Sequence, residues 1–292
     1  MPDHEQRAST INKAYAAALL LLKGRPDYLF YKASPHLFAL VLQKFGYRAD
    51  ERYARMQKTF YEGLASLSPE AVVGFFDAHE KFPYEEFLLR KLAATEMKSK
   101  LALDFGCGMG RMVRRMAPLF RRVDGVDIAA SNVEAAKRYT DALGEKPRYF
   151  VNNGRDLSRI GDGSYQFIYS TIAMHHIPVH SIRTSLLREF HRVLSEGRVA
   201  LQMVYSQSSE RARSRQRELG PAFANIAFSE WQDDFFDARS TNGANDVIIT
   251  DGTISEVRSD LEQAGFSDVE FELSDPPHEA IYDKWIFIHA RK

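Results

Sequence analysis

The sequence predicts an α/β protein with a parallel sheet covered by helices on both faces. Two observations support this prediction. From Leu101 onwards, short apolar runs alternate with stretches whose apolar residues recur at helical spacing, as in successive β-α units. Before Leu101 the apolar residues recur only at helical spacing, and no strand-like run of any length occurs.

Residues 1–98 are therefore expected to form a helical cap region, and residues 99–292 the α/β domain. Helical spacing and end signals predict helices over residues 10–22, 34–47, 68–82 and 84–97. In the second of these, Ser34 is a candidate cap, proline occupies the first helical position and Gly46 ends the helix.

The domain itself divides into strands and helices in alternation. The expected strands cover residues 101–105, 122–128, 148–153, 166–172, 198–205, 268–273 and 284–291. The expected helices cover residues 111–120, 131–143, 181–194, 209–220 and 254–265. Residues at about 206–250 interrupt the alternation after the fifth strand and are expected to form a helical insertion.

Composition limits the partners. The chain has 292 residues, with 39 lysines and arginines against 39 aspartates and glutamates. A net charge of zero gives no overall field to attract nucleic acid or an anionic membrane, so neither is expected as a partner. The single cysteine, Cys107, cannot form an internal disulfide, which favours a reducing, cytoplasmic compartment. The apolar stretch at residues 14–22 is too short to span a bilayer.

A glycine-rich turn, "LALDFGCGMGRM", follows the first expected strand. A dinucleotide fingerprint would need a glycine or alanine at its sixth position, and Arg111 or Val113 stands there instead. Asp104, at the mouth of the turn, would also repel a pyrophosphate. S-adenosylmethionine has no phosphate and carries an ammonium and a sulfonium, so a carboxylate attracts it. Asp127, at the end of the second strand, can accept hydrogen bonds from ribose hydroxyls.

With these features the sequence resembles the class I S-adenosylmethionine-dependent methyltransferases of the small-molecule type. The resemblance rests on four motifs in order: "LDFGCGMGR", "GVDIAASNVEAAKRY", "NNGRDLSRIGDGSYQFIYSTIAMHHI" and "REFHRVLSEGRVAL". It covers about residues 99–205 and the last two strands. It implies a doubly wound, seven-stranded Rossmann-like sheet whose final strand is antiparallel, with S-adenosylmethionine as the cofactor.

The resemblance also assigns roles to residues. Asp104, Gly106, Gly108 and Gly110 would shape the methionyl and ribose pocket, and Asp127 would bind the ribose hydroxyls. The adenine and methionyl contacts are expected from Ile128, Asn153, Gly154 and Ser170. Asn153 stands where the family often has an aspartate, and its side-chain oxygen can still accept a hydrogen bond.

His176 resembles a histidine that removes the acceptor's proton in some small-molecule members of the family. We therefore predict His176 as the general base and a hydroxyl as the acceptor, because a hydroxyl gains more from a base than an amine does. The alternative is a histidine that merely fixes the loop. His175 is expected to point away, and no metal is expected at this pair, because adjacent histidines diverge and no further ligand motif is present.

Two further surfaces bear on the acceptor. The N-terminal helices and the insertion are expected to roof its pocket. Four arginines of the insertion are expected either to be solvated or paired with Asp233, Asp234 and Asp237, or to clamp an anionic substrate: Arg211, Arg213, Arg215 and Arg217.

The predicted function is methyl transfer from S-adenosylmethionine to a small-molecule acceptor, most simply a hydroxyl oxygen of a natural product or carbohydrate. An N-methyltransferase acting on a small amine, or a non-catalytic binding subunit with the same fold, are the alternatives. The sequence indicates neither the acceptor's identity nor the oligomeric state.

Overall fold

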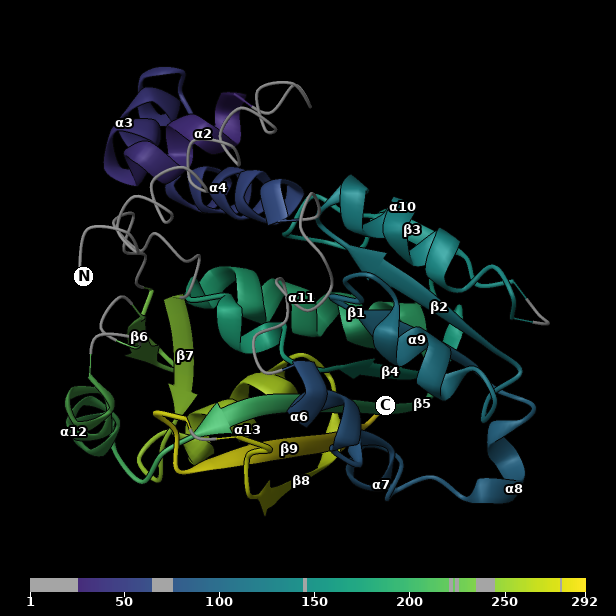
Figure 1. Cartoon of the computed structure of the whole chain (residues 1–292). Coiled ribbons are helices and arrows are strands. Elements are labelled where there is room, and N and C mark those ends of the chain that lie inside the picture. Colours follow the sequence, from purple (N-terminus) through teal and green to yellow (C-terminus); the bar gives the residue numbers. More distant parts are fainter. Residues whose placement is uncertain are drawn as a thin grey trace, which may run out of the picture.

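The computed structural model describes residues 26–64, 76–143, 146–220, 223, 226–234, 245–278 and 280–292. The helix expected at 10–22, and the first part of that expected at 68–82, lie outside these residues. The described chain forms a twisted sheet with helices on both faces and a group of N-terminal helices at one end (Figure 1).

The body of the sheet follows the predicted order. Its parallel strands are β1 (Leu101–Phe105), β2 (Arg122–Asp127), β3 (Tyr149–Val151), β4 (Tyr165–Ser170) and β5 (Leu194–Tyr205), arranged β3-β2-β1-β4-β5. Beyond β5 lies β9 (Lys284–Arg291), which is antiparallel to β5 and pairs on its other edge with β8 (Ser267–Ser274). The predicted sheet with an antiparallel final strand is therefore confirmed.

Alternating side chains divide the core into two layers. On β9, Ile286 and Ile288 point to one face, whereas Trp285 and Phe287 point to the other. The first face is covered by α11 (His180–Val193) and α13 (Ile254–Gln263). The second is covered by α7 (Tyr84–Leu88) and α9 (Arg111–Met116), while α10 (Ala130–Tyr139) lies against β2 and β3.

The single helix expected at 84–97 is in fact two, α7 and α8 (Ala94–Met97). Between them the chain turns so that Arg90 and Lys91 reach Glu272 and Glu270 on β8. These ion pairs join the end of the cap region to the sheet edge.

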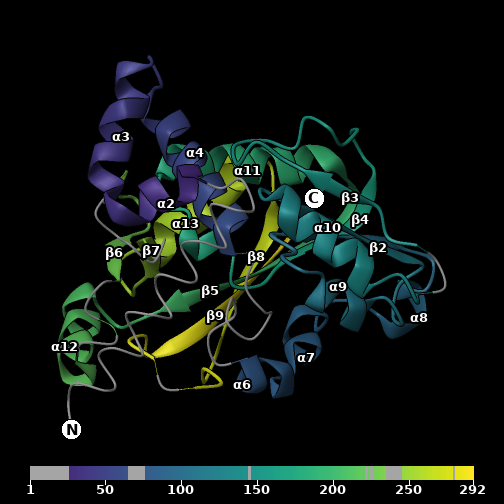
Figure 2. The same ribbon diagram turned by 45° about the horizontal axis from the view of Figure 1, so that its top comes forward.

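Three of the N-terminal helices form a small unit of their own: α2 (Pro26–Ala33), α3 (Pro35–Lys44) and α4 (Ala49–Leu64). The fourth, α6 (Phe76–Lys81), lies apart from them, and the ring of its His79 stacks on those of Tyr84 and Trp285. In α3, Pro35 occupies the first turn as expected, but the Ser34 side chain makes no capping hydrogen bond. Aromatic side chains of α2 and α3 pack on Met56 and Phe60 of α4. Figure 2 shows this group above the sheet, with α4 nearest to it.

The insertion is only partly helical, which corrects the expectation of a helical insertion. It contains α12 (Ser209–Leu219) and two short parallel strands, β6 (Ala227–Glu230) and β7 (Asn245–Ile249). β7 pairs with the last two residues of β5, beyond the point where β4 ends. Consequently β7 extends the sheet at its carboxyl edge, where ligands bind in open α/β sheets.

The arginines of α12 lie on an exposed surface, and none of the partners that the structure describes for them is Asp233 or Asp234. Arg211 pairs with Asp283, Arg215 with Glu218, and Arg213 lies over the ring of Phe228. Asp237 lies outside the described residues. None of these four arginines lines the cavity described below.

Glu62 fastens α4 to the domain, which gives a first testable prediction. The residue before α10 is Ala129, which has no side chain to cap the helix, and Glu62 instead accepts hydrogen bonds from the amides of Ala130 and Ser131. Glu62→Ala should therefore lower the free energy of unfolding by about 1–2 kcal/mol. Urea unfolding measures this loss. Glu134→Ala, which removes an exposed glutamate of the same helix, should leave the free energy of unfolding almost unchanged; equal losses in the two variants would contradict the capping role.

Candidate functional site

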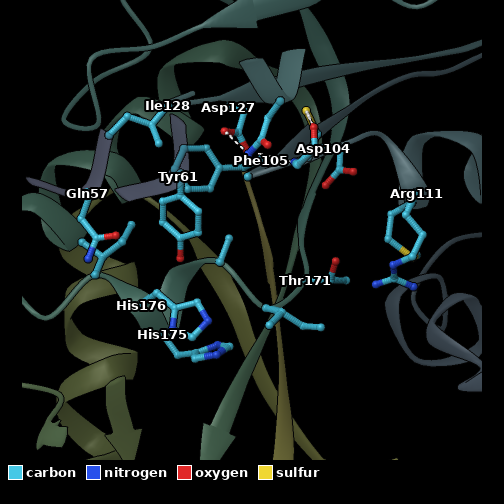
Figure 3. A pocket seen from close by; sticks show the side chains of 18 of the residues that line it. Gln57, Tyr61, Asp104, Phe105, Arg111, Asp127, Ile128, Thr171, His175 and His176 are labelled. Atoms are coloured by element: carbon cyan, nitrogen blue, oxygen red, sulfur yellow. Dashed lines mark hydrogen bonds between the residues drawn. The ribbon is translucent and has the colours of Figure 1, made fainter. Parts of the chain in front are cut away.

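A cavity of about 860 Å³ lies at the carboxyl ends of β1, β2 and β4. Its lining comes from the sheet, from α4 and α6 of the N-terminal region, and from the insertion through Phe223, Ile226 and Asp246. Figure 3 shows Asp104 and Asp127 on one side of it and His175 and His176 across from them, with Tyr61 of α4 between. The structure thus brings residues 104, 127 and 176 into one space.

The glycine turn has the backbone that glycine permits. Gly106, Gly108 and Gly110 all have positive φ, and α9 begins directly after Gly110. Gly106 and Gly108 line the cavity, and a Cβ on Gly108 would meet no atom within 4 Å. Gly110 instead faces Ala136 and Tyr149, so its part in the site is to start the helix.

Asp104 is buried at the end of β1 without a hydrogen bond. Neither of its carboxylate oxygens has a hydrogen-bond partner among the described residues, and only 1% of its surface is exposed. Burial raises the pKa of Asp104 to about 8, although the charge of Arg111 opposes this shift. A buried, unsatisfied carboxyl group facing a cavity is arranged to receive a donor or a cation.

The raised pKa gives a prediction about stability. The unfolded chain ionises Asp104 near the ordinary value of 3.8, whereas the folded chain resists ionisation up to about 8. The unfolded state thus binds fewer protons in this range, and this group's contribution to stability falls as pH rises from about 4 to about 8. Asp104→Asn should unfold less readily than the parent at pH 8 and differ less at pH 5. Denaturant unfolding at the two pH values measures the difference in free energy of unfolding between the variant and the parent. If the variant's advantage over the parent were smaller at pH 8 than at pH 5, the prediction would be wrong.

Asp127 is held in a fixed orientation at the end of β2. Its Oδ2 accepts from the amide of Gly108 at 2.9 Å, and its Oδ1 accepts from the amide of Ala129 and the side chain of Asn132. Burial raises its pKa, while these donors act in the opposite sense. The bond to Gly108 links this carboxylate to the glycine turn.

Ile128 and Gly154 lie together next to Asp127. Both line the cavity, and a Cβ on Gly154 would lie 2.6 Å from Cδ1 of Ile128. Glycine at 154 therefore leaves the space that the Ile128 side chain occupies.

Asn153 does not line the cavity, which corrects its predicted adenine contact. Its side chain accepts from the amides of Arg155 and Asp156 and donates to the Asp156 carboxylate, forming an exposed turn. Asn152 lines the cavity in its place, with a buried Oδ1 that has no hydrogen-bond partner among the described residues. The prediction was off by one residue because the side of the chain that faces the cavity is set by the turn after β3.

Ser170 is likewise structural rather than part of the cavity lining. It is fully buried, and its hydroxyl donates to the carbonyl of Phe105, tying β4 to β1. Thr171 and Ile172 line the cavity instead. Ile172 has a φ of 56°, unfavourable for a β-branched residue, and its amide is held by the side chain of Gln202 at 2.7 Å.

His176 forms a hydrogen-bonded pair with a carboxylate that sequence analysis missed. Its Nδ1 lies 2.6 Å from Oδ1 of Asp246, 70 residues further along the chain on β7. Tyr282 donates to the other oxygen of Asp246. Burial raises the pKa of Asp246, but His176 and Tyr282 outweigh burial, so the net pKa lies below its ordinary value. An ionised Asp246 that accepts from Nδ1–H leaves Nε2 of His176 as a proton acceptor.

The loop that carries His176 is braced from both sides. Tyr53 of α4 donates to the carbonyl of His176, and the buried Arg183 donates to the carbonyls of Ile177 and Trp231. Tyr53 is 2% exposed. The N-terminal region therefore helps to position the loop, a contact for which local sequence patterns give no signal.

His175 does not point away from the site as expected. Its ring lies 4.0 Å from that of His176, lines the same cavity and is 4% exposed. Burial lowers the pKa of His175 to about 3, so its ring is neutral. Within the described chain, His175, His176 and Asp246 form one group whose potential metal-ligating atoms lie within 4.8 Å of one another.

The residues at the glycine turn fit the cofactor implied by the sequence. Asp104 offers two unsatisfied buried oxygens to a cation, Gly108 offers a backbone cradle with open space in front of it, and Asn152 offers a further unsatisfied acceptor. The unsatisfied acceptors of Asp104 and Asn152 favour a cationic ligand rich in donors over a pyrophosphate, and the open space at Gly108 lets such a ligand approach the backbone.

Comparison with known proteins points the same way. Residues 102–197 match the family model described as a methyltransferase domain. The mouse N-terminal Xaa-Pro-Lys N-methyltransferase 1 is 38% identical over 78 residues, which are 26% of this chain and 34% of that protein. The chain thus spans about a third of the length of this curated relative.

Two solved structures share the fold. One is the 1,6-didemethyltoxoflavin-N1-methyltransferase of Burkholderia thailandensis, with bound 1,6-didemethyltoxoflavin and S-adenosylhomocysteine. It has a TM-score of 0.54 and 18% identity, over 89% of this chain and 90% of that chain. The other is the magnesium protoporphyrin IX methyltransferase of Synechocystis with bound S-adenosylmethionine, at a TM-score of 0.54 and 13% identity, over 82% of this chain and 97% of that chain. None of the described helices is long and apolar enough to cross a membrane.

Proposed function

Because the chain belongs to the class I S-adenosylmethionine-dependent methyltransferase superfamily, we propose that it transfers a methyl group from S-adenosylmethionine to a small-molecule acceptor. The observation that carries this proposal is the single cavity that joins Asp104, Asp127 and the His176–Asp246 pair. The residues that would bind the methyl donor and a histidine that can accept a proton line the same cavity, which argues against a non-catalytic subunit.

The donor end would be held by residues of the first two strands. Asp104 would balance the positive charge of the methionyl end, and Asp127, fixed by Gly108 and Ala129, would accept from the ribose hydroxyls. Ile128 would pack on the adenine. When bound, the cofactor supplies a methyl group on a positively charged sulfur, so the protein mainly has to align the acceptor.

The acceptor we propose is a hydroxyl oxygen, with His176 as its base. Nε2 of His176 would take the hydroxyl proton, and Asp246 would hold the ring in the tautomer that leaves this nitrogen free. Tyr282 and Tyr53 would fix Asp246 and the loop carbonyl, so that the imidazole needs no reorganisation before it accepts the proton.

A small amine is the second candidate acceptor. The mouse relative and the Burkholderia structure are both named as N-methyltransferases, and an amine can be bound already neutral. On this alternative His176 fixes the loop and takes no proton.

Calorimetric titration tests the donor assignment. We expect saturable binding of S-adenosylmethionine and S-adenosylhomocysteine and no binding of NAD. With S-adenosylmethionine at pH 7, Asp104 should lose the proton that burial lets it keep, so the apparent heat should change with the ionisation heat of the buffer. Absence of binding, or preference for NAD, would overturn the proposal.

A further inference from the structure

The cavity continues past His176 into a wall built from rings. We call this the aromatic wall, and it consists of His79, Phe223, His278, Tyr282 and Trp285. These residues come from α6, from the segment after α12, from the segment before β9 and from β9 itself. A cavity of this size accommodates a drug-sized ligand, and here it must serve two ligands.

The rings of the aromatic wall are ordered by stacking. The ring of His79 lies 5.5 Å from that of Trp285 at an interplanar angle of 17°, and His278 meets His79 edge-on at 5.1 Å. Trp285 also stacks on Tyr84. Burial lowers the pKa of His79 to about 3, so its ring is neutral at physiological pH. Flat rings that stack on one another favour a flat, apolar partner.

Most charged side chains next to the aromatic wall already have an oppositely charged partner: Arg111 lies 3.7 Å from Glu80 and over the ring of Tyr84. Arg114 has no carboxylate partner among the described residues, but it lies over the ring of Tyr139 on α10, an element that does not contribute to the aromatic wall. Asp246 is paired with His176. The remaining carboxylates of the described lining, Asp104 and Asp127, belong to the donor end. A charged acceptor would therefore have to be desolvated without gaining a new counter-charge.

The acidity of the hydroxyl matters because a histidine is a modest base. A phenol has a pKa of about 10, as in tyrosine, whereas the pKa of an ordinary hydroxyl, such as that of water, is much higher. Proton transfer to an imidazole therefore costs much less free energy from a phenol than from an ordinary hydroxyl. A His–Asp pair is thus better suited to a phenol than to an aliphatic alcohol.

We propose that the acceptor is an uncharged, planar aromatic molecule that is methylated on a phenolic hydroxyl. This inference rests on the proposed function and specifies its substrate class. The phenol's O–H bond breaks and its proton passes to Nε2 of His176. The oxygen gains the methyl group, whose former bonding pair stays with the cofactor's sulfur. The ring of the acceptor lies along the aromatic wall.

A binding comparison on the full chain, saturated with S-adenosylhomocysteine, tests this class directly. The probes are 2-naphthol, the anion 6-hydroxy-2-naphthoate and the saturated alcohol trans-2-decalol. We expect 2-naphthol to bind at least about tenfold more tightly than either of the others, which corresponds to ~1.4 kcal/mol. Similar affinities for naphthol and naphthoate would contradict the proposal that the acceptor is uncharged. Similar affinities for naphthol and decalol would contradict the proposal that it is aromatic.

A pair of variants sharpens the test of charge. Glu80→Gln removes the partner of Arg111 inside the cavity, so the preference for naphthol over naphthoate should narrow several-fold. Glu85→Gln is the matched control, because Glu85 pairs with Arg115 and does not line the cavity; it should leave the preference as it is. If Glu80→Gln left the preference for naphthol over naphthoate unchanged, it would contradict the claim that Glu80 neutralises Arg111.

Two outcomes separate this inference from the function on which it rests. If S-adenosylhomocysteine binds but 2-naphthol does not, the aromatic phenol class is overturned and the proposal of methyl transfer stands. If S-adenosylhomocysteine itself does not bind, the proposed function fails together with the acceptor class.

Discussion

Replacing His176 with alanine should lower kcat by about 10²- to 10⁴-fold, the usual contribution of a general base, while affinity for S-adenosylhomocysteine stays within a few-fold. The reason is geometric: Nδ1 of His176 is committed to Asp246 at 2.6 Å, so only Nε2 can take the acceptor's proton. The measurement is single-turnover methyl transfer to a phenol that the enzyme methylates, with calorimetry for the cofactor.

The chain offers a matched control for this experiment. His180 forms the same kind of pair with Asp260, at 2.7 Å, but does not line the cavity. His180→Ala should therefore leave kcat within a few-fold of the parent. Similar losses in both variants would show that the His176 effect is structural.

Asp246→Asn distinguishes a base from a metal ligand at the same place. Without the carboxylate, Nδ1–H of His176 loses the acceptor that fixes the tautomer of the ring, so kcat should fall. Chelators should leave the parent's activity unchanged. Loss of activity on chelation, restored by a divalent metal, would instead assign His175, His176 and Asp246 as metal ligands.

Replacing Asp127 with alanine should weaken S-adenosylhomocysteine binding by about 10²-fold, or ~2–3 kcal/mol, because the ribose hydroxyls lose a charged acceptor. The same change releases the amide of Gly108, so the glycine turn also loses its support. Calorimetry measures the affinity, and thermal unfolding reports whether the variant is folded.

Asp124→Asn controls for the loss of a buried carboxylate on the same strand. Asp124 binds Arg122, the amide of Arg148 and the hydroxyl of Tyr165, and it does not line the cavity. This variant should be less stable but should bind S-adenosylhomocysteine as the parent does. If Asp127→Ala bound S-adenosylhomocysteine as tightly as the parent, Asp127 would not be the residue that binds the ribose hydroxyls.

The proximity of the residues at the glycine turn could be predicted from sequence because it depends on local geometry. Asp104 lies near the end of β1, Gly106 and Gly108 follow it directly, and Asp127 ends β2, so parallel pairing alone brings them together. Asn153 and Ser170 were misplaced by one residue each, in favour of Asn152 and Thr171. Strand periodicity ends with the strand, and the turn that follows decides which side chain faces the cavity.

The surroundings of His176 could be predicted only in part. His176 follows the fourth strand and lines the cavity, but its partner Asp246 lies 70 residues away in an insertion whose strands local patterns did not predict. The helix α4 was not among the expected N-terminal helices, although it supplies Tyr53, Tyr61 and Glu62 to the loop, the cavity and α10. These contacts depend on tertiary packing, and no local periodicity encodes them.

A crystal structure of the full chain with S-adenosylhomocysteine tests the central claim most directly. We expect the ribose hydroxyls to bind Asp127, the amino group to lie at Asp104 and the sulfur to face the part of the cavity that holds His176. A ligand bound elsewhere, or one whose sulfur lies away from His176 with the adenine in its place, would contradict it.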